Sequence, residues 1–128
     1  MTPLLLALAA AAQAPAPSPT DLKAFEDCTA LVRSDPQKAV ELANQWRVKG
    51  GALLARQCLG LAYVALERWA PAATAFEQAA MEAETAKDPR RADLWVQSGN
   101  SWLAANDGAQ ARKAFDSALA TTLLTPEL

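Results

Sequence analysis

Residues 59–76 (LGLAYVALERWAPAATAF) and residues 98–115 (SGNSWLAANDGAQARKAF) are two copies of one pattern. The step along the chain from Gly60 to Gly99, here called the repeat step, keeps large and small side chains in phase. The other matched positions are Tyr63 with Trp102, Ala65 with Ala104, Ala72 with Ala111, Phe76 with Phe115, and Ala79 with Ala118. Bulky and small residues set how closely two helices approach, so this repetition indicates a repeated packing unit.

Each copy is predicted to form two helices. In the first copy, residues 52–67 and residues 71–87 both carry apolar side chains at helical spacing. We expect Arg68-Trp69-Ala70 to turn the chain, with Pro71 at the first position of the second helix, where proline is tolerated. The segment MEAETAK (residues 81–87) is a good helix former, so it predicts a lengthened second helix rather than a loop.

The second copy shows clearer boundary signals. Asp88 is the expected N-cap of its first helix, with Pro89 at the first helical position. Asn106-Asp107-Gly108 is a strong turn signal, and a last helix is expected over residues 109–123.

A third, weaker unit precedes the two copies. Helices are expected over residues 21–33 and from Asp35-Pro36 to Gly50-Gly51. Ala39 is the counterpart of Ala72 in this unit, whereas Asp27 stands where the other units have glycine. This first unit is therefore divergent, as terminal units of an array often are.

Together these positions resemble the tetratricopeptide repeat (TPR) family. The residues that carry the resemblance are Leu59, Gly60, Tyr63, Ala72, Phe76, Ala79, Trp95, Gly99, Trp102, Ala111, Phe115 and Ala118. Pro89 stands where that family usually has its closing proline. The step from Ala39 to Ala72 is close to the family's period of about 34 residues, whereas the repeat step is longer by about five residues. Ser98 also replaces a usual leucine.

The resemblance implies an all-α, right-handed superhelical α-solenoid of about three helix-turn-helix hairpins. Its units would be a divergent hairpin over residues 20–51, a repeat with a lengthened second helix over 52–88, and a repeat over 89–124. Residues 125–128 would begin a further helix or form a disordered tail. A generic alanine-rich helical bundle is the alternative.

Composition agrees with a helical protein and argues against an enzyme. About a quarter of the chain is alanine, the best helix former, and only 6% is aromatic. The chain has no histidine, which removes the usual general base and the commonest metal ligand, so no catalytic residue, metal or cofactor is expected. A net charge of −2 provides no general attraction to nucleic acid or to anionic lipid.

The N-terminal segment predicts export. Residues 1–12 (MTPLLLALAAAA) are apolar, too short to span a bilayer, and end in the small residues that a signal peptidase prefers. We expect cleavage near Ala12, an extended Pro/Ala-rich linker over residues 13–19, no stable membrane span afterwards, and a periplasmic location in a bacterium. The alternative is a buried or disordered N-terminal helix.

Cys28 and Cys58 are the only cysteines. An even count in an exported protein favours one disulfide, which would stabilise the fold by roughly 3–4 kcal/mol. Two small buried thiols on alanine-rich helices are an equal alternative. No CxxC spacing or histidine accompanies them, so a zinc site is not expected.

The resemblance further implies a concave groove, lined by the first helix of each hairpin, that binds a protein or peptide segment. The positions carried over to it are Leu54, Gln57, Leu61, Val64, Val96, Asn100 and Leu103. Gln57 and Asn100 would hydrogen-bond a peptide backbone, whereas the family's basic clamp for a terminal carboxylate is missing. An ordinary solvated helix face is the alternative for the same residues.

The sequence therefore predicts a non-enzymatic scaffold or adaptor for protein–protein contact in the cell envelope. The alternative function is a structural subunit of an envelope assembly or a homo-oligomer. That subunit would use the C-terminal helix face, for which no polar capping helix is evident.

Overall fold

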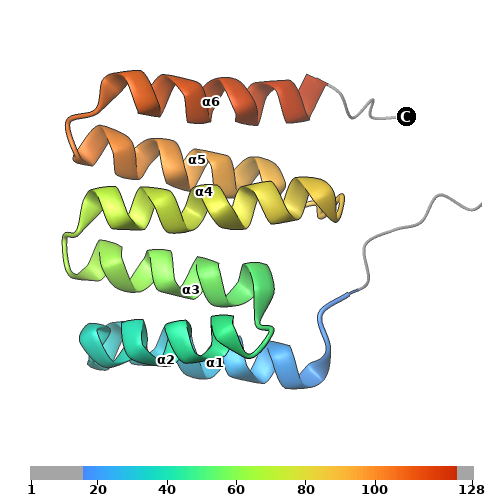
Figure 1. Ribbon diagram of the computed structural model, residues 1–128, viewed down its shortest axis with the longest axis vertical. Helices are drawn as coiled ribbons and strands as arrows, with labels where there is room; N and C mark the ends of the chain where they lie inside the picture. The colour runs from blue at the N-terminus through green and yellow to red at the C-terminus, as the bar shows by residue number, and fades with distance from the viewer. Residues whose placement is uncertain (1–15, 124–128) are drawn as a thin grey trace, which may run out of the picture.

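The computed structural model describes residues 16–123, and these form six α-helices and no strand (Figure 1). The helices are α1 (Pro19–Ser34), α2 (Pro36–Val48), α3 (Ala52–Ala65), α4 (Trp69–Thr85), α5 (Arg91–Ala104) and α6 (Gly108–Leu123). Consecutive helices pack side by side with alternating direction, and α1 also packs on α3. The prediction of an all-α protein is confirmed. The predicted signal segment 1–12, the start of the linker and residues 125–128 lie outside the described residues.

Three helices begin with a side-chain cap that the local sequence supplies. Ser18 Oγ accepts a hydrogen bond from the Asp21 N–H at 3.1 Å, and Asp35 caps α2 in the same way at the Lys38 N–H. Asp107 Oδ1 accepts from the Gln110 N–H at 3.1 Å at the start of α6. Proline follows the first two caps, so α1 begins at Pro19, the last residue of the predicted linker.

Two predicted helix starts are wrong. Helix α4 begins at Trp69 rather than at Pro71, because the chain has already reversed at Glu67 and can resume a helix at once. Helix α5 begins at Arg91 rather than at Pro89. Asp88 Oδ1 accepts from the Arg90 N–H at 2.9 Å, so the expected capping bond is made, but in the turn that precedes the helix, where the Arg90 guanidinium also holds the carboxylate.

Helix α4 has 17 residues, one more than the described part of α6, its counterpart in the second copy. It continues into the segment 81–87 as far as Thr85, so that part of the segment is helical. Its last turns bury Ala79, Ala80 and Ala83 against the rest of the core.

The four turns after α2, α3, α4 and α5 share one hydrogen-bonded reversal, and the α2–α3 turn has a further positive φ at Ala52 (50°). In each, the second residue beyond the helix has a positive φ: Gly50 (94°), Glu67 (56°), Lys87 (53°) and Asn106 (63°). The next N–H then donates to a carbonyl five residues earlier, as in the Schellman motif. The four bonds are Gly51 to Trp46 (2.9 Å), Arg68 to Tyr63 (2.9 Å), Asp88 to Ala83 (2.8 Å) and Asp107 to Trp102 (2.9 Å). Repeating one turn keeps the helix stack regular.

A glycine and a phenylalanine pack together at each crossing of the two repeat copies. A Cβ on Gly60 would lie 2.6 Å from the Phe76 ring, and a Cβ on Gly99 would lie 2.5 Å from the Phe115 ring. The aromatic rings therefore rest on bare backbone, which brings α3 close to α4 and α5 close to α6. The two contacts are related by the same repeat step that relates the two sequences.

Cys28 on α1 and Cys58 on α3 form a disulfide, with Cα atoms 6.3 Å apart. Both side chains are fully buried, in a cluster that also contains Ala39, Ala43 and Ala62. The pairing that the sequence left open thus joins the divergent first unit to the first repeat copy.

Gly99→Ala is expected to lower the free energy of unfolding by about 1–3 kcal/mol, because its methyl group would overlap the Phe115 ring. Gly108→Ala is the matched control, since nothing lies within 4 Å of a Cβ there. Urea denaturation followed by circular dichroism measures both. Equal effects of the two substitutions would contradict the close approach.

Glu67→Gly is expected to raise the free energy of unfolding by about 1 kcal/mol, because glycine adopts a positive φ without the steric cost that Glu67 carries. Gly50→Ala, in the equivalent turn position and with open space around it, should lower it by a similar amount. The same denaturation assay applies. A loss of stability in Glu67→Gly would show that its side chain, rather than its backbone, matters in the turn.

Candidate functional site

A groove of about 230 Å³ lies between α3 and α5, next to α4. Its lining is Leu61 and Val64 from α3, Trp69 and Phe76 from α4, and Gln97, Asn100 and Ser101 from α5. We call it the α3–α5 groove. Phe76 thus serves both the helix crossing at Gly60 and this groove.

The groove includes three of the seven residues that the sequence carried over to a binding site. These are Leu61, Val64 and Asn100. Leu54 does not line this groove: it is 6% exposed and belongs to the same buried cluster as Leu94.

The other three carried-over residues do not line the groove. Gln57 is partly buried on α3, while Val96 and Leu103 are exposed on α5 (40% and 54%).

Sequence reasoning missed four residues of the groove: Trp69, Phe76, Gln97 and Ser101. Trp69 was expected in a turn, but it opens α4 and is partly buried. Gln97 had a signal that could have been used. The repeat step aligns it with Cys58, the residue of α3 that faces the preceding first helix, so Gln97 is the residue of α5 expected to face α3.

Gln97 carries a buried acceptor without a partner. Within residues 16–122, its Oε1 is the one buried side-chain nitrogen or oxygen that makes no hydrogen bond. Leaving such an acceptor unsatisfied costs about 1–3 kcal/mol, and Gln97 is one of the residues that line the groove.

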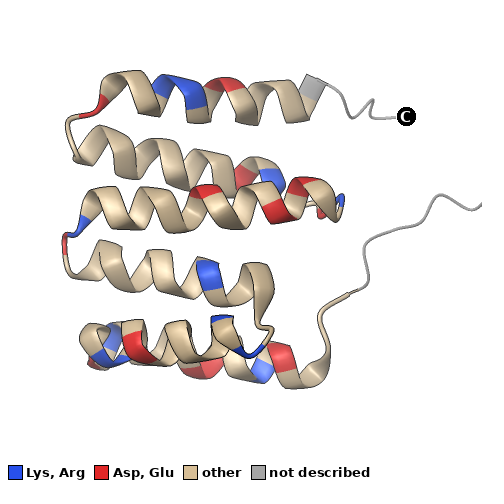
Figure 2. Cartoon of the chain, viewed as in Figure 1, with Lys and Arg blue, Asp and Glu red and all other residues tan. Residues whose placement is uncertain are grey.

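No charged residue lines the α3–α5 groove. Helix α3 has one charged residue, Arg56, which pairs with Glu82 of α4 and donates to Gln78. Helix α5 has charges only at Arg91 and Asp93, both in its first turn (Figure 2). A ligand of this groove therefore meets a neutral, largely apolar surface with amide groups at one side.

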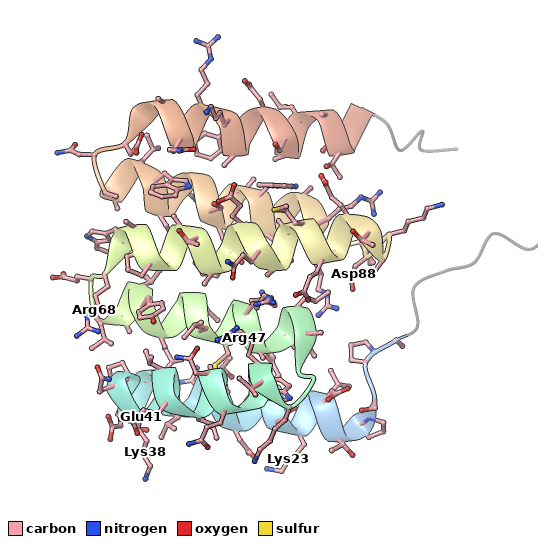
Figure 3. The ribbon with its side chains drawn as sticks, viewed as in Figure 1. Lys23, Lys38, Glu41, Arg47, Arg68 and Asp88 are labelled. Carbon is pink, nitrogen blue, oxygen red and sulfur yellow. A yellow bond between two sulfur atoms is a disulfide. The ribbon has the colours of Figure 1, made fainter. Side chains whose placement is uncertain are left out.

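The turn between α4 and α5 holds a separate polar cluster (Figure 3). Arg90 donates to the Asp88 carboxylate from Nε at 2.9 Å and from Nη2 at 2.6 Å, and this contact lowers the pKa of Asp88 despite its burial. Arg91 Nη1 donates to the Asp88 carbonyl at 2.9 Å. Both arginines of this turn, Arg90 and Arg91, thus donate hydrogen bonds to Asp88 and help to hold the turn.

Ser98, which stands where the tetratricopeptide pattern usually has leucine, makes a hydrogen bond that leucine could not make. Its hydroxyl is fully buried and donates to the Ala73 carbonyl at 2.9 Å, which ties α5 to α4. Trp95, on the same helix, donates from Nε1 to Glu84 Oε1 at 2.8 Å.

Within the described part of the chain, no three His, Cys, Asp or Glu side chains gather closely enough to hold a metal ion. None of the helices in that part has the length and apolar character needed to cross a bilayer.

Comparison with protein-family models, curated proteins and solved structures finds no match to this chain. The tetratricopeptide interpretation therefore rests on the residues and packing described above.

Gln97→Met is expected to raise the free energy of unfolding by about 1 kcal/mol, because it removes the unsatisfied oxygen and keeps the side-chain length. Gln45→Met, at an exposed position of α2, is the control and should change it by less than about 0.5 kcal/mol. Urea denaturation of the oxidised protein provides the comparison. A less stable Gln97→Met variant would mean that water already satisfies the oxygen.

Proposed function

We propose that this chain is a short TPR-like α-solenoid that mediates protein–protein contact. Three features support a right-handed stack of three helix hairpins: the repeat step, the paired glycine–phenylalanine crossings, and the four equivalent turns. In such a scaffold, binding residues project from first helices that the hairpins hold in register.

One observation carries the proposal: a neutral apolar groove contains a buried acceptor that lacks a donor. The partner segment inserts an apolar side chain between Leu61, Val64 and Trp69, and the Gln97 side chain turns toward the groove so that its buried oxygen accepts from a backbone N–H of the partner. Burying one large apolar side chain contributes about 1.5–3 kcal/mol. Asn100 lies at the same groove and offers both a donor and an acceptor to the partner backbone.

The size of the groove favours a side chain over a cofactor. Pockets that enclose small molecules usually hold about 300–1,000 Å³, and this groove is smaller, at about 230 Å³. The hydroxyl of Ser101 at this groove donates to the backbone carbonyl of Gln97, and the chain has no histidine to activate that hydroxyl. We therefore propose a binding role rather than a catalytic one.

We further propose that the protein acts in the bacterial periplasm. The apolar segment 1–12 supports export. The Cys28–Cys58 disulfide supports it too, because such bonds persist mainly in oxidising compartments.

The test is affinity capture from envelope extract with matched aspartate variants. Val64→Asp puts a charge in the α3–α5 groove, whereas Leu22→Asp puts one on a 48% exposed position of α1. We expect Val64→Asp to reduce recovery of the captured partner about tenfold or more, because a carboxylate is costly to bury there, and Leu22→Asp to leave recovery unchanged. Quantitative mass spectrometry measures recovery, and circular dichroism checks folding.

Gln97→Met sharpens this test because it is expected to be at least as stable as the natural chain. Reduced capture by a more stable variant would support a role of the Gln97 oxygen in recognition. Equal recovery by the natural chain, Val64→Asp and Gln97→Met would rule out the groove as the binding site.

One observation favours the second candidate function, a self-associating structural subunit. Leu119 on α6 is 62% exposed, on the helix that ends the described stack. Sedimentation of the natural chain and of Leu119→Asp distinguishes the two functions: a dimer that the substitution dissociates favours the subunit, and a monomer that still captures a partner favours the module.

A further inference from the structure

A second groove, of about 490 Å³, lies between α2 and α4 over α3. Tyr63 is part of its lining, and Leu61 and Tyr63 lie roughly 160° apart around the helix, so α3 presents opposite sides to the two grooves. We call this second site the Arg47 groove, after its one charged lining residue. Its other lining residues with polar side-chain groups are Asn44, Tyr63, Thr74 and Gln78.

Arg47 is an unpaired cation at this groove. It is exposed and forms no ion pair or hydrogen bond with the described residues, whereas Arg56 and Arg90 are both paired with carboxylates. Figure 3 shows it on the side of α2 that faces α3. The guanidinium is always charged and has a planar set of donors that matches a carboxylate.

The neutral side chains around Arg47 add donors. Gln78 accepts from Arg56 Nη1 through its carbonyl oxygen at 3.5 Å, which leaves its NH₂ group available. The Asn44 amide and the Thr74 and Tyr63 hydroxyls make no side-chain hydrogen bond with the described residues. A site with this many free donors around one cation favours an anionic acceptor.

Nearby carboxylates do not neutralise the groove. Glu82, one turn beyond Gln78 on α4, is paired with Arg56. Glu41 is exposed on α2, about 9 Å along the helix axis from Arg47, and forms no ion pair with it. The charge of Arg47 is thus available to a partner.

The apolar residues that line the groove favour an anion with an aliphatic stem over a free inorganic anion. Leu59, Tyr63 and Pro71 provide surface for an aliphatic stem, which a free inorganic anion does not have. A glutamate side chain has both parts, with two methylene groups and a carboxylate at the end. Charge and shape together favour an acidic side chain of an extended peptide.

We propose that the Arg47 groove binds a glutamate side chain of a partner segment, with the carboxylate on Arg47 and flanking hydrogen bonds from Asn44 and Gln78. The site is independent of the neutral α3–α5 groove, so it adds a second recognition surface of opposite chemistry. A partner that reaches both sides of α3 would present an apolar side chain to one and an acidic side chain to the other.

The test uses two peptides that differ only in charge. The full chain, labelled with ¹⁵N and kept oxidised, is titrated with acetyl-Ala-Glu-Leu-Glu-Ala-amide and with its Gln counterpart. NMR follows the side-chain amides of Asn44 and Gln78 and the Nε–H of Arg47. We expect shifts at these groups with the Glu peptide, and binding weaker by about fivefold or more with the Gln peptide.

Arg47→Gln and Arg112→Gln form a matched pair of variants. Arg112 is an exposed cation on α6, away from the groove, so its loss changes net charge equally. Arg47→Gln is expected to weaken binding of the Glu peptide by about fivefold, and Arg112→Gln is expected to leave its binding unchanged. Both positions are on the surface, so both variants are expected to fold, and their NMR spectra report this directly.

Three outcomes would overturn the proposal. Equal binding of the Glu and Gln peptides would show that the groove does not recognise the negative charge of the peptide. Equal weakening by Arg47→Gln and Arg112→Gln would show general electrostatic attraction instead of a site. Inorganic phosphate producing the same shifts at the same concentration would indicate a small-anion site instead of a peptide site.

Discussion

The contact of a phenylalanine ring with a bare glycine backbone is the constraint on which the remaining structure depends. It occurs at Gly60 with Phe76 and again at Gly99 with Phe115, and neither glycine has room for a methyl group. The same close approach therefore recurs in both helix pairs, α3 with α4 and α5 with α6. Phe76 also lines the α3–α5 groove.

The turns extend this regularity along the chain. Four turns use one hydrogen-bonded reversal, yet only one has glycine at the position with positive φ. Glu67, Lys87 and Asn106 adopt that conformation at a steric cost that the packed helices on either side offset. Uniform turns and crossings keep α3 in the centre of the described stack, with the disulfide on one neighbour and the groove on the other.

Helix α3 separates two surfaces of different chemistry. One groove is neutral and apolar and contains the unsatisfied oxygen of Gln97. The other presents the unpaired cation of Arg47 among neutral donors. Neither arrangement contributes to the stability of the chain alone, because an unsatisfied acceptor costs free energy and a lone surface cation adds none. Both would become favourable if a partner supplied the missing group, and this is the physical basis of the binding role that we propose.

The sequence by itself determined the helices and the repeat step, because periodicity and side-chain size are local properties of the chain, whereas the contact of Phe76 with Gly60 came from the structure. It also identified three residues of the neutral groove. Only the tertiary structure decided that α4 begins at Trp69, that Leu54 is buried, that Cys28 meets Cys58, and that Gln97 lacks a donor. These facts depend on which helix lies opposite each side chain, and that follows from the separation of packed helices, which no local pattern contains.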